Sequence, residues 1–252
     1  MTDIKKPFVL LTNDDGYDAP GLQKLMDMLS EKVNLLVVAP SKQMSATSHS
    51  ITLDTDMKLE QMEDFAFSLD GTPVDCTFFA FSKLIKNKPD LVISGINLGP
   101  NLGSDTLYSG TVGAALYAAK QNVPAIAISL VSHEQDDAQY DTAVDLIENI
   151  LEKGVWKDFS GRVMNINVPN LPASELLGIR SANLAELIYT EGFEEGDSEN
   201  SWRYVCEDPV SFSSGDSDNS LIKRGFASIS ILKPDLYCEE SQEKLSQLIN
   251  QL

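Results

Sequence analysis

The sequence FVLLTNDDGYDAPGLQKLMDMLSEK, residues 8–32, combines a short apolar run, a polar turn and a helical pattern. The run Phe8–Thr12 is continuous rather than alternating, which is typical of a strand covered on both faces of a sheet. It stops at Asn13–Gly16, and a helical pattern follows from about Gly21 to Lys32. A strand, a loop and a helix in this order indicate the first half of a βαβ unit, so we expect a parallel sheet.

The same texture recurs along the chain. Further continuous apolar runs lie at 35–39, 91–94, 125–130 and 163–168, and helical patterns lie at 73–86, 111–121 and 141–153. We therefore predict an α/β fold over residues 1–177, with a doubly wound, mainly parallel sheet in an α/β/α sandwich. From residue 178 the stretches become shorter and alternating, as at 202–205 and 227–232, before an amphipathic tail from 239 to 252. Residues 178–252 are thus expected to form a smaller β-rich extension with a terminal helix.

The chain of 252 residues carries a formal charge of −19. Affinity for a nucleic acid polymer comes largely from Lys and Arg neutralising phosphates, so we expect no nucleic acid partner. Three scattered cysteines do not suit a disulfide framework. The short apolar run after Lys5 and Lys6 lacks the form of a signal peptide, and no stretch approaches the roughly 20 apolar residues that span a bilayer. We therefore expect a cytoplasmic protein without membrane contact.

Polar side chains directly follow three of the predicted strands. In open α/β sheets, ligands bind beyond the carboxyl ends of the strands, where such side chains would meet. The oxygen donors at these places are Asp14 and Asp15, Ser45 and Thr47, and Asn97 and Asn101. Adjacent carboxylates repel each other unless a cation lies between them, although Asn and Asp are also favoured in turns and helix caps. Carboxylate, hydroxyl and amide oxygens suit Mg²⁺ or Mn²⁺ rather than zinc.

The segment Tyr108–Ala115, YSGTVGAA, is a run of mostly small residues at the start of a predicted helix. The N–H groups and the positive dipole end of a helix N-terminus bind phosphate, and the hydroxyls of Ser109 and Thr111 add donors. Ser or Thr before an Ala-rich helix is also a common N-cap, so this pattern alone leaves both interpretations open. The sequence contains no GxxxxGK[ST], GxSxG, HExxH or CxxC motif, which disfavours P-loop kinases, serine hydrolases and zinc proteases.

Four blocks of the sequence together resemble the stationary-phase survival protein E family, the SurE-type 5′-nucleotidases. They are LLTNDDGYDAPGL (10–22), the segment from Ala39 through Ser45 to Thr52, DGTPVDC (70–76) and SGINLGPNLGSDTLYSGTVGAA (94–115). Fainter similarity continues through 163–169 and 217–232, so the resemblance covers nearly the whole chain. Two places depart from it: Ala46 stands where the family usually has Gly, and Tyr117-Ala118 where it usually has Glu-Gly.

The resemblance implies a Rossmann-like core with a C-terminal extension that is exchanged between the subunits of a homodimer or homotetramer. It implies one Mg²⁺ or Mn²⁺ ion per subunit and removal of phosphate from nucleoside 5′-monophosphates, often from 3′-nucleotides as well. The metal ligands that it carries over are Asp14, Asp15, Ser45 and Asn97, and the phosphate contacts are Asn101, Ser109, Gly110 and Thr111.

We therefore expect a metal-dependent phosphomonoesterase, a 5′-nucleotidase, whose cation polarises a phosphoryl oxygen and positions or ionises a water molecule. Asp14 or Asp15 is expected to accept a proton from that water, and the sequence does not distinguish between them. Asn101 and the helix N-terminus at 109–111 would stabilise charge on the phosphoryl oxygens. Two alternatives stay open: a short-chain polyphosphatase or general acid phosphatase, and a non-catalytic nucleotide-binding module on the same fold.

Overall fold

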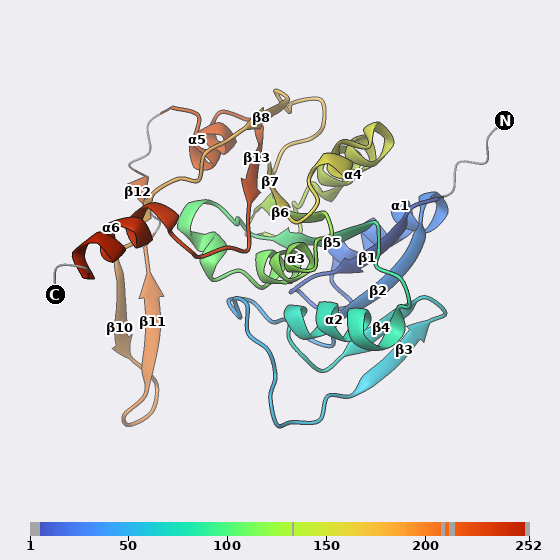
Figure 1. The fold of residues 1–252 in the computed structure, drawn as a ribbon, viewed down its shortest axis with the longest axis horizontal. Helices are drawn as coiled ribbons and strands as arrows, with labels where there is room; N and C mark the ends of the chain where they lie inside the picture. The colour runs from blue at the N-terminus through green and yellow to red at the C-terminus, as the bar shows by residue number, and fades with distance from the viewer. Residues whose placement is uncertain (1–5, 133, 208–209, 212–214, 250–252) are drawn as a thin grey trace.

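The computed structural model describes residues 6–132, 134–207, 210–211 and 215–249, and its centre is a nine-stranded sheet (Figure 1). The strands are β1 (Phe8–Thr12), β2 (Asn34–Pro40), β3 (Leu59–Glu63), β4 (Ala66–Leu69), β5 (Leu91–Leu98), β6 (Ala125–Val131), β7 (Val163–Pro169), β8 (Ile179–Ser181) and β13 (Ala227–Leu232). Their order is β3-β4-β2-β1-β5-β6-β7-β13-β8. Neighbours are parallel except for the pairs β3–β4 and β13–β7. The prediction of a mainly parallel sheet is confirmed.

Both faces of the central strands are buried. Consecutive residues of a strand face opposite sides of the sheet. Leu11 of β1 and Ile93 of β5 belong to the core on one face, and Leu10 and Val92 belong to the core on the other. All four side chains are fully buried. This double coverage explains why the strands appear in the sequence as continuous apolar runs.

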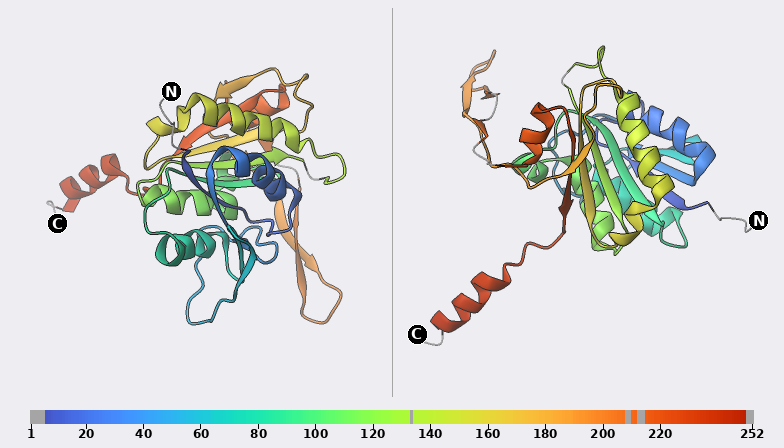
Figure 2. Two further views of the ribbon diagram at one scale, coloured as in Figure 1. Left: turned by 90° about the vertical axis from the view of Figure 1, so that its right-hand side faces the viewer. Right: turned by 90° about the horizontal axis from the view of Figure 1, so that it is seen from above.

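Helices complete a three-layer sandwich around the sheet (Figures 1 and 2). Helices α1 (Pro20–Lys32) and α4 (Tyr140–Lys153) cover one face, and α2 (Pro73–Phe79) and α3 (Gly110–Lys120) cover the other. The helix predicted at 73–86 ends two residues early. It consists of α2 and a following π-helical segment over Ala80–Leu84. Most of α3 consists of small buried residues, so it packs closely on the sheet behind the carboxyl ends of the strands.

The described residues from 178 to 249 lie partly in the sheet and partly in two projections (Figure 2). Strands β8 and β13 extend the central sheet beyond β7, and α5 (Asp218–Lys223) packs against β13. Outside the sheet, β10 (Glu191–Glu195) and β11 (Trp202–Cys206) form a hairpin, and β9 (Leu187–Ile188) pairs with β12 (Val210–Ser211). Helix α6 (Glu239–Ile249) extends away from the body and contains no buried residue.

The predicted terminal helix therefore begins at Glu239 as expected, and residues 250–252 of that prediction lie outside the described residues. The predicted strands at 202–205 and 227–232 are confirmed as β11 and β13. The boundary at residue 178 stays a prediction, since the sheet continues across it. None of the helices in the described ranges is both long enough and apolar enough to cross a membrane.

Candidate active site

Asp14 lies at the carboxyl end of β1 and is bonded to two other parts of the chain. Its side chain is only 3% exposed. One carboxylate oxygen accepts the backbone N–H of Thr111 at 3.0 Å, and the other accepts the Thr111 hydroxyl. The backbone carbonyl of Asp14 accepts the N–H of Met44 at 2.7 Å. The loops after β1 and β2 and the start of α3 therefore meet at this residue.

Asp15 connects the same loop to the end of β5. Its carboxylate accepts the backbone N–H of Leu98 at 2.9 Å. The adjacent Asn97 is 9% exposed, and its side-chain NH₂ donates to the carbonyl of Gly99 at 2.8 Å. That bond orients the Asn97 amide so that its oxygen is the atom available to accept or ligate. The predicted convergence of the loops after β1, β2 and β5 at one edge of the sheet is thus observed.

A bulge in β5 places Asn97. Ser94 pairs with Ala127 and Asn97 pairs with Ser129, so β5 contains one more residue than β6 between these pairs. Gly95 lies in the bulge with φ +140°, and a Cβ there would come within 2.3 Å of the Ile128 carbonyl oxygen. Only glycine fits this position, and the bulge it permits brings Asn97 to the sheet edge.

Ser45 is exposed in the loop that follows β2. Its hydroxyl accepts the side-chain N–H of Gln43 at 3.1 Å. The loop is fixed on both sides of Ser45, by the bond from Met44 to Asp14 and by the bond from Ser48 N–H to the Tyr108 carbonyl at 2.9 Å. Ala46 has φ +58°, a left-handed conformation that costs an L residue roughly 1–2 kcal/mol.

The N-terminus of α3 directly abuts Asp14. The hydroxyl of Ser109 caps the helix by accepting the N–H of Val112 at 3.1 Å, as the N-cap interpretation of the sequence anticipates. A Cβ on Gly110 would lie 3.0 Å from the Cβ of Asp14 and 2.9 Å from the Thr47 hydroxyl. The backbone of the predicted phosphate loop therefore lies in contact with the carboxylate segment. Both donors of Thr111 are directed at Asp14.

Side chains of β6 and β7 hold Asn101 through hydrogen bonds to its backbone and its side chain. The side-chain oxygen of Asn167 accepts the backbone N–H of Asn101 at 2.8 Å, and its NH₂ donates to the Asn101 backbone carbonyl at 3.0 Å. The side-chain NH₂ of Asn165 donates to the same carbonyl at 2.9 Å. The side-chain NH₂ of Asn101 donates to the Ser129 hydroxyl at 2.7 Å. Sequence analysis did not identify these three supporting residues. Their signal is the alternation MNINV in β7, which places two amides on one side of a buried strand.

The electrostatics of the site suit a cation. Burial raises the pKa of Asp14 to about 6, against the opposing hydrogen bonds from Thr111 and with a further increase from Asp15. Burial also raises the pKa of Asp15, while its bond from Leu98 opposes the change. In the described part of the chain, neither carboxylate forms an ion pair with a Lys or Arg. Two adjacent, partly desolvated carboxylates without a basic partner fit a bound divalent ion.

The donor chemistry is all oxygen. Among the residues described, no group of three or more His, Cys, Asp or Glu side chains is placed to hold a metal. Two carboxylates with a hydroxyl and an amide oxygen match Mg²⁺ or Mn²⁺ better than zinc, which favours Cys and His. The residues present therefore fit the ion that the sequence predicts.

Comparison with known proteins places the chain in a family. The family model described as "Survival protein SurE" matches residues 9–191. The chain is 40% identical over 242 residues to the 5′-nucleotidase SurE of Carboxydothermus hydrogenoformans, covering 90% of each chain. It is 36% identical over 252 residues to the 5′/3′-nucleotidase SurE of Escherichia fergusonii, covering 96% of each.

The fold agrees with a solved structure of the same kind. The crystal structure of the SurE protein from Aquifex aeolicus matches with a TM-score of 0.80 and 29% sequence identity, over 96% of this chain and 99% of that one. The shared fold, together with a family model and relatives that span most of the sequence, shows that this chain belongs to the survival protein SurE family.

Proposed function

We propose that this chain is a metal-dependent phosphomonoesterase that hydrolyses nucleoside 5′-monophosphates, and also 3′-monophosphates, to nucleoside and phosphate. The names of its relatives support the reaction class. The observation that carries the proposal is the joining of Asp14 to both the Ser45 loop and the N-terminus of α3. A carboxylate can ligate a cation, and a helix N-terminus can bind a phosphate. Their contact therefore places a potential cation site next to a potential phosphate site.

One Mg²⁺ or Mn²⁺ ion per subunit is the proposed cofactor, with Asp14, Asp15, Ser45 and Asn97 as its ligands. When bound, such an ion neutralises charge on phosphoryl oxygens and favours ionisation of a nearby water. Thr111 holds the Asp14 carboxylate through its hydroxyl and N–H, which fixes the ligand before the ion binds.

The remaining steps belong to the chain's own groups. Ser109, Gly110 and the amide of Asn101 are proposed to bind the phosphoryl oxygens. The sequence also predicts Thr111 as a phosphate contact. Both of its donors bond to Asp14, so we propose that Thr111 instead positions that carboxylate. Asp14 or Asp15 accepts a proton as the water oxygen bonds to phosphorus. The ester P–O bond then breaks and the leaving oxygen of the nucleoside takes up a proton, which balances the hydrolysis.

Phosphate release from AMP tests this proposal. Treatment with EDTA should stop release, and Mn²⁺ should restore it. Asp14→Asn should abolish the metal-dependent rate, whereas Asp27→Asn, an exposed carboxylate of α1, serves as the matched control. Full metal-dependent activity in Asp14→Asn would contradict the site. Rates on AMP, para-nitrophenyl phosphate and short polyphosphate would separate a nucleotidase from a general phosphatase, and binding of AMP without turnover would support a non-catalytic module.

We also propose that residues 178–252 mediate a homodimer or homotetramer. The projecting hairpin exposes Phe193, Trp202 and Tyr204, and α6 exposes Leu245 and Leu248. Exposed apolar side chains gathered on projections from the body are typical of an interface. Light scattering of the wild type should give two or four chains, and a monomer would contradict the proposal. The three unpaired cysteines support the further proposal of a cytoplasmic location.

A further inference from the structure

Two cavities flank the loop that carries Ser45. The first, here called the Asp15 cavity, has a volume of about 420 Å³ and is lined by Asp15, Asp18 and Gln43 among others. The second, here called the Lys120 cavity, also measures about 420 Å³ and lies between residues 48–49, α3 and the segment after β13. A volume of this size suits a small ligand. A phosphate bound at Ser109 would therefore have a place for the rest of its molecule on either side.

The charges of the two cavities differ in sign. The Asp15 cavity is lined by two carboxylates and by no Lys or Arg. The Lys120 cavity is lined by Lys120 and Lys233 and by no carboxylate. In a chain with a formal charge of −19, this pair of lysines adds local positive charge beside the candidate active site. The Asp15 cavity therefore borders the proposed cation through Asp15, whereas the Lys120 cavity offers positive charge to a second anionic group.

Neither lysine is neutralised by a buried partner. Lys233 pairs with Asp235 at 3.7 Å, and both side chains are more than half exposed, so the pair is weak. Lys120 forms no ion pair with any residue that the structure describes. His49 also lines the cavity, and burial followed by the charge of Lys120 lowers its pKa. Two amines are therefore available to an incoming anion.

The cavity extends from the candidate phosphate loop along α3. Ser109, the N-cap of α3, lines one end, and Lys120, the last residue of the same helix, lines the other. Eleven steps of an α-helix span about 16 Å along its axis. Between the two ends the lining includes the apolar Leu107, Leu116 and Leu236. It also includes the polar Ser48, His49 and Thr106. A ligand that carries two anionic groups, one for Ser109 and one for the lysines, matches this layout.

On the basis of the proposed function, we propose that the Lys120 cavity receives the leaving group of the substrate and that Lys120 and Lys233 bind a second phosphate on it. The preferred substrate class is then a nucleoside bisphosphate. One phosphate binds beside Ser109 at the proposed metal site and is removed there, and the other binds to Lys120 and Lys233. Exposed contacts of this kind are screened by salt, so the preference should decrease as ionic strength rises.

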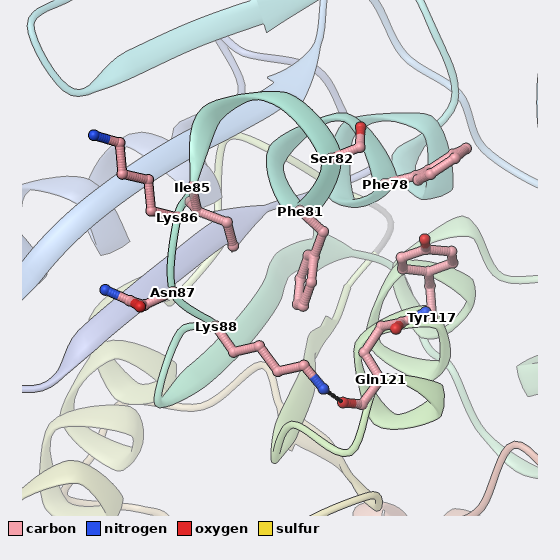
Figure 3. Close-up of a pocket in the computed structure, with 9 residues that line it drawn as sticks. All are labelled: Phe78, Phe81, Ser82, Ile85, Lys86, Asn87, Lys88, Tyr117 and Gln121. Carbon is pink, nitrogen blue, oxygen red and sulfur yellow. Dashed lines mark hydrogen bonds between the residues drawn. The ribbon is translucent and has the colours of Figure 1, made fainter.

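A pocket on the neighbouring face of α3, beside Tyr117, supplies the control. Figure 3 shows Tyr117 of α3 facing Phe78 and Phe81, with Gln121, the residue after α3, beside Lys88, and with Lys86 at the rim. Lys88 donates to the Gln121 carbonyl at 2.6 Å. This pocket contains none of the candidate site residues, so Lys86→Gln removes an exposed lysine of the same charge without touching the Lys120 cavity.

The test compares kcat/KM for adenosine 3′,5′-bisphosphate and for AMP, measured by phosphate release with Mn²⁺. The wild type should prefer the bisphosphate. The double variant Lys120→Gln/Lys233→Gln should reduce the ratio of the two kcat/KM values by roughly threefold to tenfold, mainly through KM, because each exposed contact contributes modestly. Lys86→Gln should leave the ratio unchanged. Both lysines of the double variant are exposed, so the fold should persist, and thermal melting checks this.

An unchanged ratio in the double variant, or a wild type that does not prefer the bisphosphate, would overturn the subsite. Absence of metal-dependent phosphate release from AMP by the wild type would instead overturn the proposed function. In that case calorimetric binding of the bisphosphate to the wild type and the double variant still decides the subsite: tighter binding to the wild type supports it, and equal binding refutes it.

Discussion

The hydroxyl of Thr111 offers a direct way to weaken the candidate metal site without removing a ligand. Thr111 is fully buried, its hydroxyl donates to one oxygen of Asp14, and its backbone N–H donates to the other. Thr111→Val replaces the hydroxyl with a methyl group of similar shape and keeps the backbone bond. Thr111→Ser keeps the hydroxyl and removes only the methyl group, so it is the matched control.

The size of the effect follows from the kind of bond removed. A hydrogen bond to a charged group contributes about 1.5–3 kcal/mol. If that bond holds the Asp14 carboxylate in position for the ion, its loss should weaken Mn²⁺ binding by roughly 10-fold to 100-fold, the range found for groups that support metal ligands. Thr111→Ser should lose only about 1 kcal/mol of folding stability for the missing methyl group and little metal affinity.

Isothermal titration calorimetry with Mn²⁺, on the wild type and both variants, measures the affinities. Thermal melting of the metal-free proteins shows whether each variant is folded. If Thr111→Val binds Mn²⁺ as tightly as Thr111→Ser does, the hydroxyl does not hold a ligand, and the argument that α3 prepares the metal site is refuted.

Three further outcomes are expected. Ala46→Gly should stabilise the protein by about 1 kcal/mol in urea unfolding, since it relieves the left-handed backbone at φ +58°, whereas Ala173→Gly in an exposed turn should destabilise it. Mn²⁺ at about 100 times its Kd should stabilise the wild type by about 2.7 kcal/mol and raise Tm by roughly 5–10 °C, and Asp14→Asn should lose this shift. By NMR titration the pKa of His49 should lie below its ordinary value of about 6.5, because burial and then Lys120 disfavour the imidazolium. As the pH falls below about 6.5, the unfolded chain binds a proton at His49 before the folded protein does, so folding stability decreases. Lys120→Gln should raise the pKa of His49.

The central strands could be predicted because both of their faces are buried. Five apolar runs, beginning with Phe8–Thr12, each proved to be a strand of the sheet. The edge strands could not be predicted in this way. In β3, LEQME is exposed at four of its five positions, so its sequence contains no apolar run to recognise. Its place depends on pairing with β4, which only the folded sheet provides.

The sequence predicts which residues form the site, but it predicts few of the contacts between them. The positions of Asp14, Asp15 and Asn97 at strand ends follow from the topology rule for open sheets. That Thr111 bonds to Asp14, 97 residues away, depends on how α3 packs on β5 and β6, and it leaves no local signal. The clamp of Asn165 and Asn167 on Asn101 is likewise a contact between distant segments.

The arrangement also gives a physical reason for the proposed cation. The start of α3 would face two anions: Thr111 binds the Asp14 carboxylate, and the two residues before it, Ser109 and Gly110, are the proposed phosphate contacts. A helix N-terminus offers only about half a unit of positive charge, and the Asp14 carboxylate already uses part of it. A phosphate arriving beside that carboxylate would be repelled unless a divalent ion neutralised the pair. Binding of the ion should therefore come first, and phosphate should bind weakly to the metal-free protein.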